Sequence, residues 1–221
     1  MLNDFEYQKY INTHCLSVPA CEYLETTRNS PPSRMVGTHA RSNVCTWIMS
    51  KKMGHTISTE SRTVEKAFVL LSEYDERVLE IWDQPDPIKI TRTNKNGVRR
   101  AGTYTPDFLL LNNDGPCVVE VKAEEEVEKL LQRNPSDWCR GSEGQVKYLP
   151  AEEYFSEIGL SHKVFVFKSA MQYLIANLEL LMRSRTALPV SEDFRAEILR
   201  PFEESFAWLC SKKYIEHRHQ L

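Results

Sequence analysis

The stretch TPDFLLLNNDGPCVVEVK, residues 105–122, decides the fold of this chain. Two apolar runs flank Asn112–Gly115, which is composed of residue types that favour tight turns, so the stretch predicts two strands joined in an antiparallel hairpin. The register of the two strands therefore decides which polar side chains of this stretch lie opposite one another.

The register of this hairpin is open between two possibilities. If residues 113–114 form the loop, Asp107 lies opposite Glu120; if residues 114–115 form it, Asp107 lies opposite Lys122. Either register places Asp107, Glu120 and Lys122 on one face, because side chains alternate along a strand.

Two opposed carboxylates destabilise a hairpin by a few tenths to ~1 kcal/mol unless a cation lies between them. Carboxylate and backbone carbonyl oxygens are ligands that suit Mg²⁺ or Mn²⁺. We therefore predict a divalent metal site formed by Asp107, Glu120 and the carbonyl of Val121, with Glu65 completing the set. Lys122 would supply a charge or a proton donor beside a phosphate. The alternative is an exposed ion cluster on an ordinary hairpin.

The remaining chain predicts a mixed α/β layer fold. Apolar residues at helical spacing follow Ser61, a candidate N-cap, and predict a helix that ends near Glu73. A second hairpin is expected around Asn96-Gly97, a two-residue turn signal. Further strands are expected at residues 77–82, 88–91, 102–105 and 163–168.

Three segments are expected along the chain. Residues 1–60 show no sustained periodicity, and residues 1–50 are taken as an N-terminal extension. Residues 51–169 form the α/β domain. Residues 170–221 form a small helical module, which we expect to dock a partner protein. Its helical stretches are Met171–Met182, with Ser169 as a candidate cap, and residues 192–199 and 202–212.

Composition and charge exclude several classes. The 221 residues are 41% hydrophobic with a net charge of −3 and contain no apolar run that could span a bilayer, so we expect a soluble intracellular protein. A wholly basic nucleic-acid binder is excluded, but local basic clusters can still contact phosphates. The basic residues on the hairpin around Asn96-Gly97 could alternatively be solvated charges that protect an edge strand from aggregation. The candidate DNA contacts are Lys51, Lys52, Arg62, Lys89, Arg92, Lys95, Arg99 and Arg100.

Several motifs together resemble one family. Pro106-Asp107 followed by Glu120-Val-Lys122, after a helix with a glutamate, is the layout of the PD-(D/E)xK nuclease superfamily. The surrounding sequence over about residues 50–168 resembles the TnsA endonuclease subunits of heteromeric bacterial transposases, and the short tail resembles compact versions from CRISPR-associated transposons. The motifs that carry this resemblance are residues 51–57, 60–65, 75–78, 83–85 and 104–107.

This resemblance implies a restriction-endonuclease-like core, a mixed sheet flanked by helices, that binds Mg²⁺, with Mn²⁺ able to substitute. It implies metal ligands at Glu65 and Asp107, a third metal position at Glu120 and a catalytic lysine at Lys122. Glu60, five residues before Glu65, competes for the role of the helix glutamate.

The resemblance also implies a division of labour on double-stranded DNA. This subunit would cut the 5′ strands at transposon ends, while the DDE transposase subunit TnsB processes the 3′ strands under the AAA+ regulator TnsC. The protein would work in the bacterial cytoplasm, on the nucleoid. The alternatives are a stand-alone restriction or repair nuclease of the same superfamily, and a DNA-binding scaffold with a vestigial site.

Overall fold

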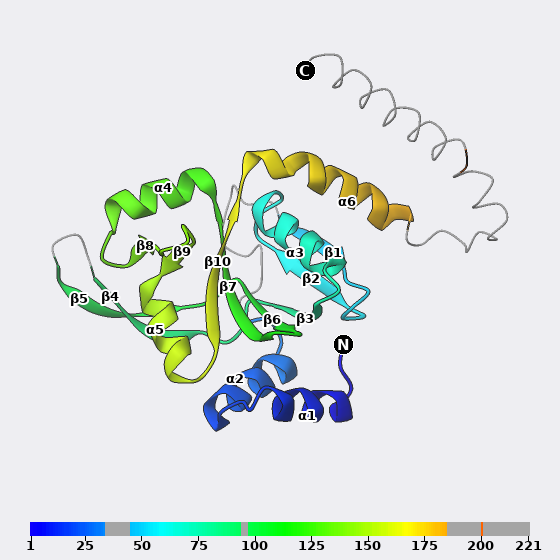
Figure 1. Cartoon of the computed structure of the whole chain (residues 1–221), viewed down its shortest axis with the longest axis horizontal. Coiled ribbons are helices and arrows are strands. Elements are labelled where there is room, and N and C mark those ends of the chain that lie inside the picture. Colours follow the sequence, from blue (N-terminus) through cyan, green and yellow to red (C-terminus); the bar gives the residue numbers. More distant parts are fainter. Residues whose placement is uncertain (34–44, 94–96, 185–199, 201–221) are drawn as a thin grey trace, which may run out of the picture. The chain divides into compact units, whose positions relative to one another are not determined.

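The computed structural model describes residues 1–33, 45–93, 97–184 and 200 (Figure 1). The chain divides into two compact units, residues 1–179 and residues 180–221. The helical stretches expected at 192–199 and 202–212 lie outside the described residues. Within the described part of the chain, no helix has the length and apolar character needed to cross a membrane.

Helices and strands alternate along the chain. The helices are α1 Asp4–Thr13, α2 Val18–Asn29, α3 Val64–Tyr74, α4 Glu124–Arg133, α5 Leu149–Glu157 and α6 Gln172–Ser184, with a 3-10 turn at Ser169–Met171. The strands are β1 Thr46–Met49, β2 Thr56–Thr59, β3 Val78–Asp83, β4 Ile88–Thr93, β5 Arg99–Tyr104, β6 Phe108–Asn112, β7 Gly115–Ala123, β8 Trp138–Arg140, β9 Val146–Tyr148 and β10 Ser161–Phe167. Ser169, expected as a cap, instead begins the 3-10 turn before α6.

A mixed four-stranded sheet with the order β10-β7-β6-β3 forms the centre of the first unit. Strands β3, β6 and β7 are antiparallel neighbours, whereas β10 runs parallel to β7. Residues 108–111 of β6 are all buried, as expected for an inner strand covered on both faces. The expected α/β class is confirmed.

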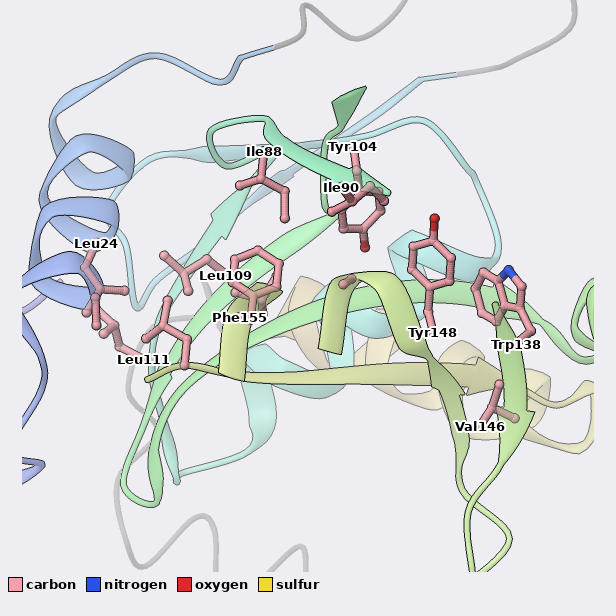
Figure 2. Close-up of a cluster of buried hydrophobic side chains, with 14 of the residues drawn as sticks. Leu24, Ile88, Ile90, Tyr104, Leu109, Leu111, Trp138, Val146, Tyr148 and Phe155 are labelled. Carbon is pink, nitrogen blue, oxygen red and sulfur yellow. The ribbon is translucent and has the colours of Figure 1, made fainter. Parts of the chain in front are cut away.

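Helices cover both faces of this sheet. On one face, Phe68 of α3 packs against the rings of Phe108 and Phe165. This arrangement is a restriction-endonuclease-like core. The other face carries a buried apolar cluster (Figure 2) that includes Leu24 of α2, Leu109, Leu111, Val118 and Phe155 of α5.

The start of the chain is helical, although its sequence shows no sustained apolar periodicity. Helix α1 begins with a capping box between Asn3 and Glu6, and the Ser17 hydroxyl caps α2. Tyr7 and Tyr10 are buried in the same cluster as the sheet residues. Because the buried face of α1 is built from tyrosines, the apolar periodicity of this segment is weak.

The β4–β5 hairpin exists, but its expected two-residue turn is wrong. Thr93 pairs with Arg99, so five residues rather than Asn96-Gly97 alone connect the strands. This register puts Tyr104 opposite Ile88 on the core face, where both are buried. A two-residue loop would shift the pairing by one residue and turn Tyr104 to the opposite face.

Candidate active site

The candidate site lies at the open end of the β6–β7 hairpin. Asn112 pairs with Gly115 and Phe108 pairs with Val119, so residues 113–114 form the loop. The next position of this register sets Asp107 opposite Glu120, which settles the choice between the two registers that the sequence left open.

Asp107, Glu120 and Lys122 meet at this end of the hairpin. The Val121 N–H donates a hydrogen bond of 2.7 Å to Asp107 Oδ2, and Lys122 Nζ lies 2.6 Å from Glu120 Oε1. Asp107 is only 9% exposed and Glu120 only 7% exposed. The structure therefore holds two buried carboxylates and one ammonium group together.

The backbone of Asp107 is anchored from the neighbouring strand. The N–H of Gln84, which follows β3, donates a hydrogen bond of 2.9 Å to the Asp107 carbonyl. Gln84 has a φ of 46°, in the left-handed region that non-glycine residues rarely adopt. Such strain is maintained only when the surroundings fix it, so the position of Asp107 is set by the fold.

The site carries more negative than positive charge. Burial raises the pKa of Asp107 well above its ordinary value and the Glu120 carboxylate raises it further, against the opposing effects of Lys122 and the Val121 N–H. Burial alone would lower the pKa of Lys122, but Glu120 and Asp107 outweigh it and hold that pKa above the ordinary lysine value. Lys122 is therefore protonated at neutral pH, and one positive charge serves two carboxylates.

Two further residues belong to the site and were missed by sequence reasoning. The Tyr104 hydroxyl donates a hydrogen bond of 2.6 Å to Glu120 Oε2, and His162 Nε2 lies 3.2 Å from the same hydroxyl. Tyr104 stands three residues before Asp107, within the motif of residues 104–107 that carries the family resemblance, and that motif is the available signal. His162, at the start of β10, carried no such signal.

Glu65 lies near this group but not within one ligand cluster. It sits in the first turn of α3, where its Oε2 accepts a 2.7 Å hydrogen bond from the Glu60 N–H. Its charge contributes to the raised pKa of Asp107. Glu60 precedes the helix, so Glu65 is the glutamate that α3 carries. Among the described residues, no three His, Cys, Asp or Glu side chains are grouped closely enough to hold a metal ion.

The candidate DNA-binding residues fall into two groups. On the β4–β5 hairpin, Arg92 lies directly opposite Arg100. Lys52, in contrast, donates hydrogen bonds from Nζ to the carbonyls of Asp75 and Val78, where it fixes the end of α3. Lys95 lies outside the described residues. The exposed candidates are Lys51, Arg62, Lys89, Arg92, Arg99 and Arg100.

Comparison with known proteins gives one result that bears on this site. Residues 75–166 match the family model described as TnsA-like endonuclease N terminal. No curated protein matches the chain. The matched stretch runs from the end of α3 into β10 and includes Asp107, Glu120 and Lys122. Residues 75–166 are therefore a TnsA-like endonuclease domain.

Proposed function

We propose that this protein is a metal-dependent DNA endonuclease that cuts the 5′ strands at transposon ends within a heteromeric transposase. The observation that carries the proposal is the group formed by Asp107, Glu120 and Lys122, in which two buried carboxylates share one ammonium. This group lies inside the TnsA-like domain.

The donor set of this group fits Mg²⁺, with Mn²⁺ as a substitute. Proteins typically hold Mg²⁺ with one or two carboxylates and leave the remaining positions to waters and substrate phosphates. Asp107, Glu120 and the Val121 carbonyl would be the protein ligands. The carboxylate oxygens that already accept a hydrogen bond each have a second lone pair for an ion. We propose Glu65 as a further oxygen donor, because its charge already acts on Asp107. A bound ion would polarise the phosphate and lower the pKa of a coordinated water.

Lys122 would act on the substrate rather than on the metal. Its ammonium is protonated at neutral pH, since Glu120 and Asp107 raise its pKa. A protonated lysine cannot serve as the general base, but it can stabilise negative charge that develops on the phosphate. Its pairing with Glu120 keeps this charge beside the carboxylates until DNA arrives.

We propose the β4–β5 hairpin as the main DNA contact. Arg92 and Arg100 are directly opposed like charges, which destabilise a hairpin unless an anion lies near them. A phosphate would relieve this repulsion, and phosphate contacts position DNA without reading its sequence. Lys89 and Arg99 extend the basic surface of the hairpin. Lys52 is not among the proposed DNA contacts, because its Nζ donates to the Asp75 carbonyl at the end of α3.

The DDE transposase subunit TnsB and the AAA+ regulator TnsC are the partners that we propose. Helix α6 exposes Tyr173 and Leu174 but buries Ile175 and Leu178. A truncation that tests docking by the tail should therefore end after Ser184, so that the buried part of α6 is kept. If this truncated protein still co-purifies with both partners, docking belongs to another surface.

Substitution of Lys122 by Ala tests the chemistry. We expect Lys122→Ala to fold, to bind Mg²⁺ and to assemble with the transposase, but to lose at least ~10²-fold of the 5′ cutting rate, the scale for removal of one preorganised electrostatic group. Labelled transposon-end DNA would report both strands, with the partner's 3′ cut as an internal control. Lys129→Ala, on the exposed face of α4, is the matched variant and should cut normally.

The outcomes separate the alternatives. Near wild-type 5′ cutting by Lys122→Ala would remove the lysine from the mechanism. Cutting of any DNA by the wild-type protein without a transposase would favour a stand-alone nuclease. No cutting under either condition would favour a scaffold with a vestigial site.

A further inference from the structure

Both oxygens of Glu120 are held by hydrogen bonds from different directions. Lys122 Nζ binds Oε1 at 2.6 Å and the Tyr104 hydroxyl binds Oε2 at 2.6 Å. The carboxylate is buried, so few other donors can reach it. The orientation of its plane is therefore decided by these two contacts.

The Tyr104 hydroxyl is itself held in place by His162. A carboxylate can only accept, so the single hydroxyl proton of Tyr104 points to Glu120, and the bond to His162 Nε2 has to be donated by the histidine. This assigns the Nε2–H tautomer. Burial lowers the pKa of His162 to about 4, so its ring is neutral at physiological pH. The ring stacks on Phe155 with an interplanar angle of 2°, which fixes its orientation.

The rest of the Tyr104 side chain is packed in the apolar cluster. Figure 2 shows its ring among buried residues beside Tyr148. The centroids of the two rings are 5.4 Å apart. A chain of hydrogen bonds thus runs from His162 through Tyr104 to Glu120 and on to Lys122. Only its last two members carry the proposed chemistry, and the first two fix their geometry.

We propose that Tyr104, oriented by His162, is a positioning residue that sets the carboxylate of Glu120 for the ion and for Lys122. This inference rests on the proposed nuclease function. Removing the hydroxyl leaves Oε2 without its donor and frees the carboxylate to rotate. Loss of such an orienting partner typically reduces activity or metal affinity by about 10- to 100-fold.

Substitution of Tyr104 by Phe removes the hydroxyl and keeps the packed ring. We expect Tyr104→Phe to bind transposon-end DNA with unchanged affinity, and to cut the 5′ strand about 10- to 100-fold more slowly in single-turnover assays. The Mn²⁺ concentration that half-maximally stabilises the protein against heat should rise by a similar factor. Tyr10→Phe is the matched control, because its buried hydroxyl donates to the Asn112 carbonyl at the far end of the same hairpin. It should change neither quantity.

Variants of His162 separate positioning from general packing. His162→Gln keeps an N–H donor for the tyrosine and should retain most activity, whereas His162→Leu should slow cutting. Because both residues act through one contact, Tyr104→Phe combined with His162→Leu should be no slower than Tyr104→Phe alone. Additive losses would indicate separate structural damage and would overturn the proposal.

A crystal structure of Tyr104→Phe tests the inference without any activity. We expect the 2.6 Å contact between Glu120 Oε1 and Lys122 Nζ to be lost. If that contact persists, or if the variant cuts at the wild-type rate while the wild-type protein is active, the positioning role is wrong and the nuclease function stands. If the wild-type protein never cuts, the nuclease function fails, and the crystal structure still decides the role of Tyr104.

Discussion

Two groups of buried acids lie on the same face of the central sheet, and their charges are compensated to different extents. Glu80 of β3 is fully buried and receives four hydrogen bonds: two from Arg28 at 3.0 Å, one from the Trp82 indole at 2.8 Å and one from the Leu2 N–H at 2.8 Å. Asp107 and Glu120, in contrast, share the single ammonium of Lys122.

This difference separates a structural acid from a functional one. Arg28 and Glu80 form an ion pair that connects α2 to β3. The charge of Glu80 is balanced within the fold, so this pair does not require a bound cation. In the other group two buried carboxyl groups face one ammonium, and burial together with Glu120 raises the pKa of Asp107. Unbalanced buried charge is costly to the fold and is typical of sites that bind a cation or a substrate.

The largest effect is expected when the balanced cluster is broken. Arg28→Ala leaves Glu80 buried without its counter-charge, which should lower the free energy of unfolding by about 3–5 kcal/mol. Urea denaturation of the wild-type and variant proteins would measure this difference. Arg77→Ala removes an exposed ion pair with Asp75 and should change stability little or not at all. If both variants lowered the free energy of unfolding by the same small amount, Arg28 would not be the group that balances the charge of Glu80.

The second prediction concerns His162, the neutral end of the network at the candidate site. The unfolded chain protonates this side chain below about pH 6.5, whereas the folded protein does so only near pH 4, because burial lowers its pKa. Stability should therefore fall as the pH falls through this window, by up to about 3 kcal/mol.

His162→Gln isolates this contribution. Between pH 7 and pH 4.5 the urea midpoint of the wild-type protein should fall relative to that of the variant, because only the wild type carries the histidine. Parallel curves for the two proteins would mean that His162 is not buried in its neutral form. The carboxylates contribute equally to both curves, so the difference between them reports on the histidine.

The sequence was sufficient to predict contacts within one hairpin but not contacts between hairpins. Asp107 and Glu120 could be set on one face because the period of a strand is two residues and the turn lies nearby. The meeting of Tyr104 with Glu120 joins the end of β5 to β7, two strands of different sheets, and no local pattern specifies this contact. The same holds for Arg28 and Glu80, which lie 52 positions apart in the sequence.

The third prediction concerns the cation that the unbalanced group is expected to bind. An ion that binds only the native state should contribute about 1.4 kcal/mol at ten times its Kd. Thermal unfolding in increasing Mg²⁺ or Mn²⁺ would measure it, and Asp107→Ala should abolish the shift. An unchanged wild-type midpoint in roughly 10 mM metal, about a hundred times the Kd of a site with a Kd of ~0.1 mM, would contradict the metal site.

The smallest effect is also the sharpest test of the comparison. Asp107→Asn keeps an oxygen that can accept the Val121 N–H bond but removes one of the two opposed charges. In metal-free buffer at neutral pH we expect this variant to be more stable than the wild type by up to about 1 kcal/mol, the scale of a like-charge cross-strand pair. Glu80→Gln should have the opposite sign, because it removes the charge that Arg28 requires.

The pH dependence of this gain follows from the pKa of Asp107, which burial and Glu120 raise in the folded protein. Well below the ordinary value of 3.8 the carboxyl is protonated in both states, so the substitution should be nearly neutral there. As the pH rises above that value, the unfolded chain ionises first and the wild type loses stability relative to Asp107→Asn. The gain should therefore grow towards neutral pH, as measured by urea midpoints in EDTA, and Mg²⁺ should reduce it by stabilising only the wild type. A variant that is less stable than the wild type at every pH would mean that the charge of Asp107 is already balanced within the fold, as that of Glu80 is.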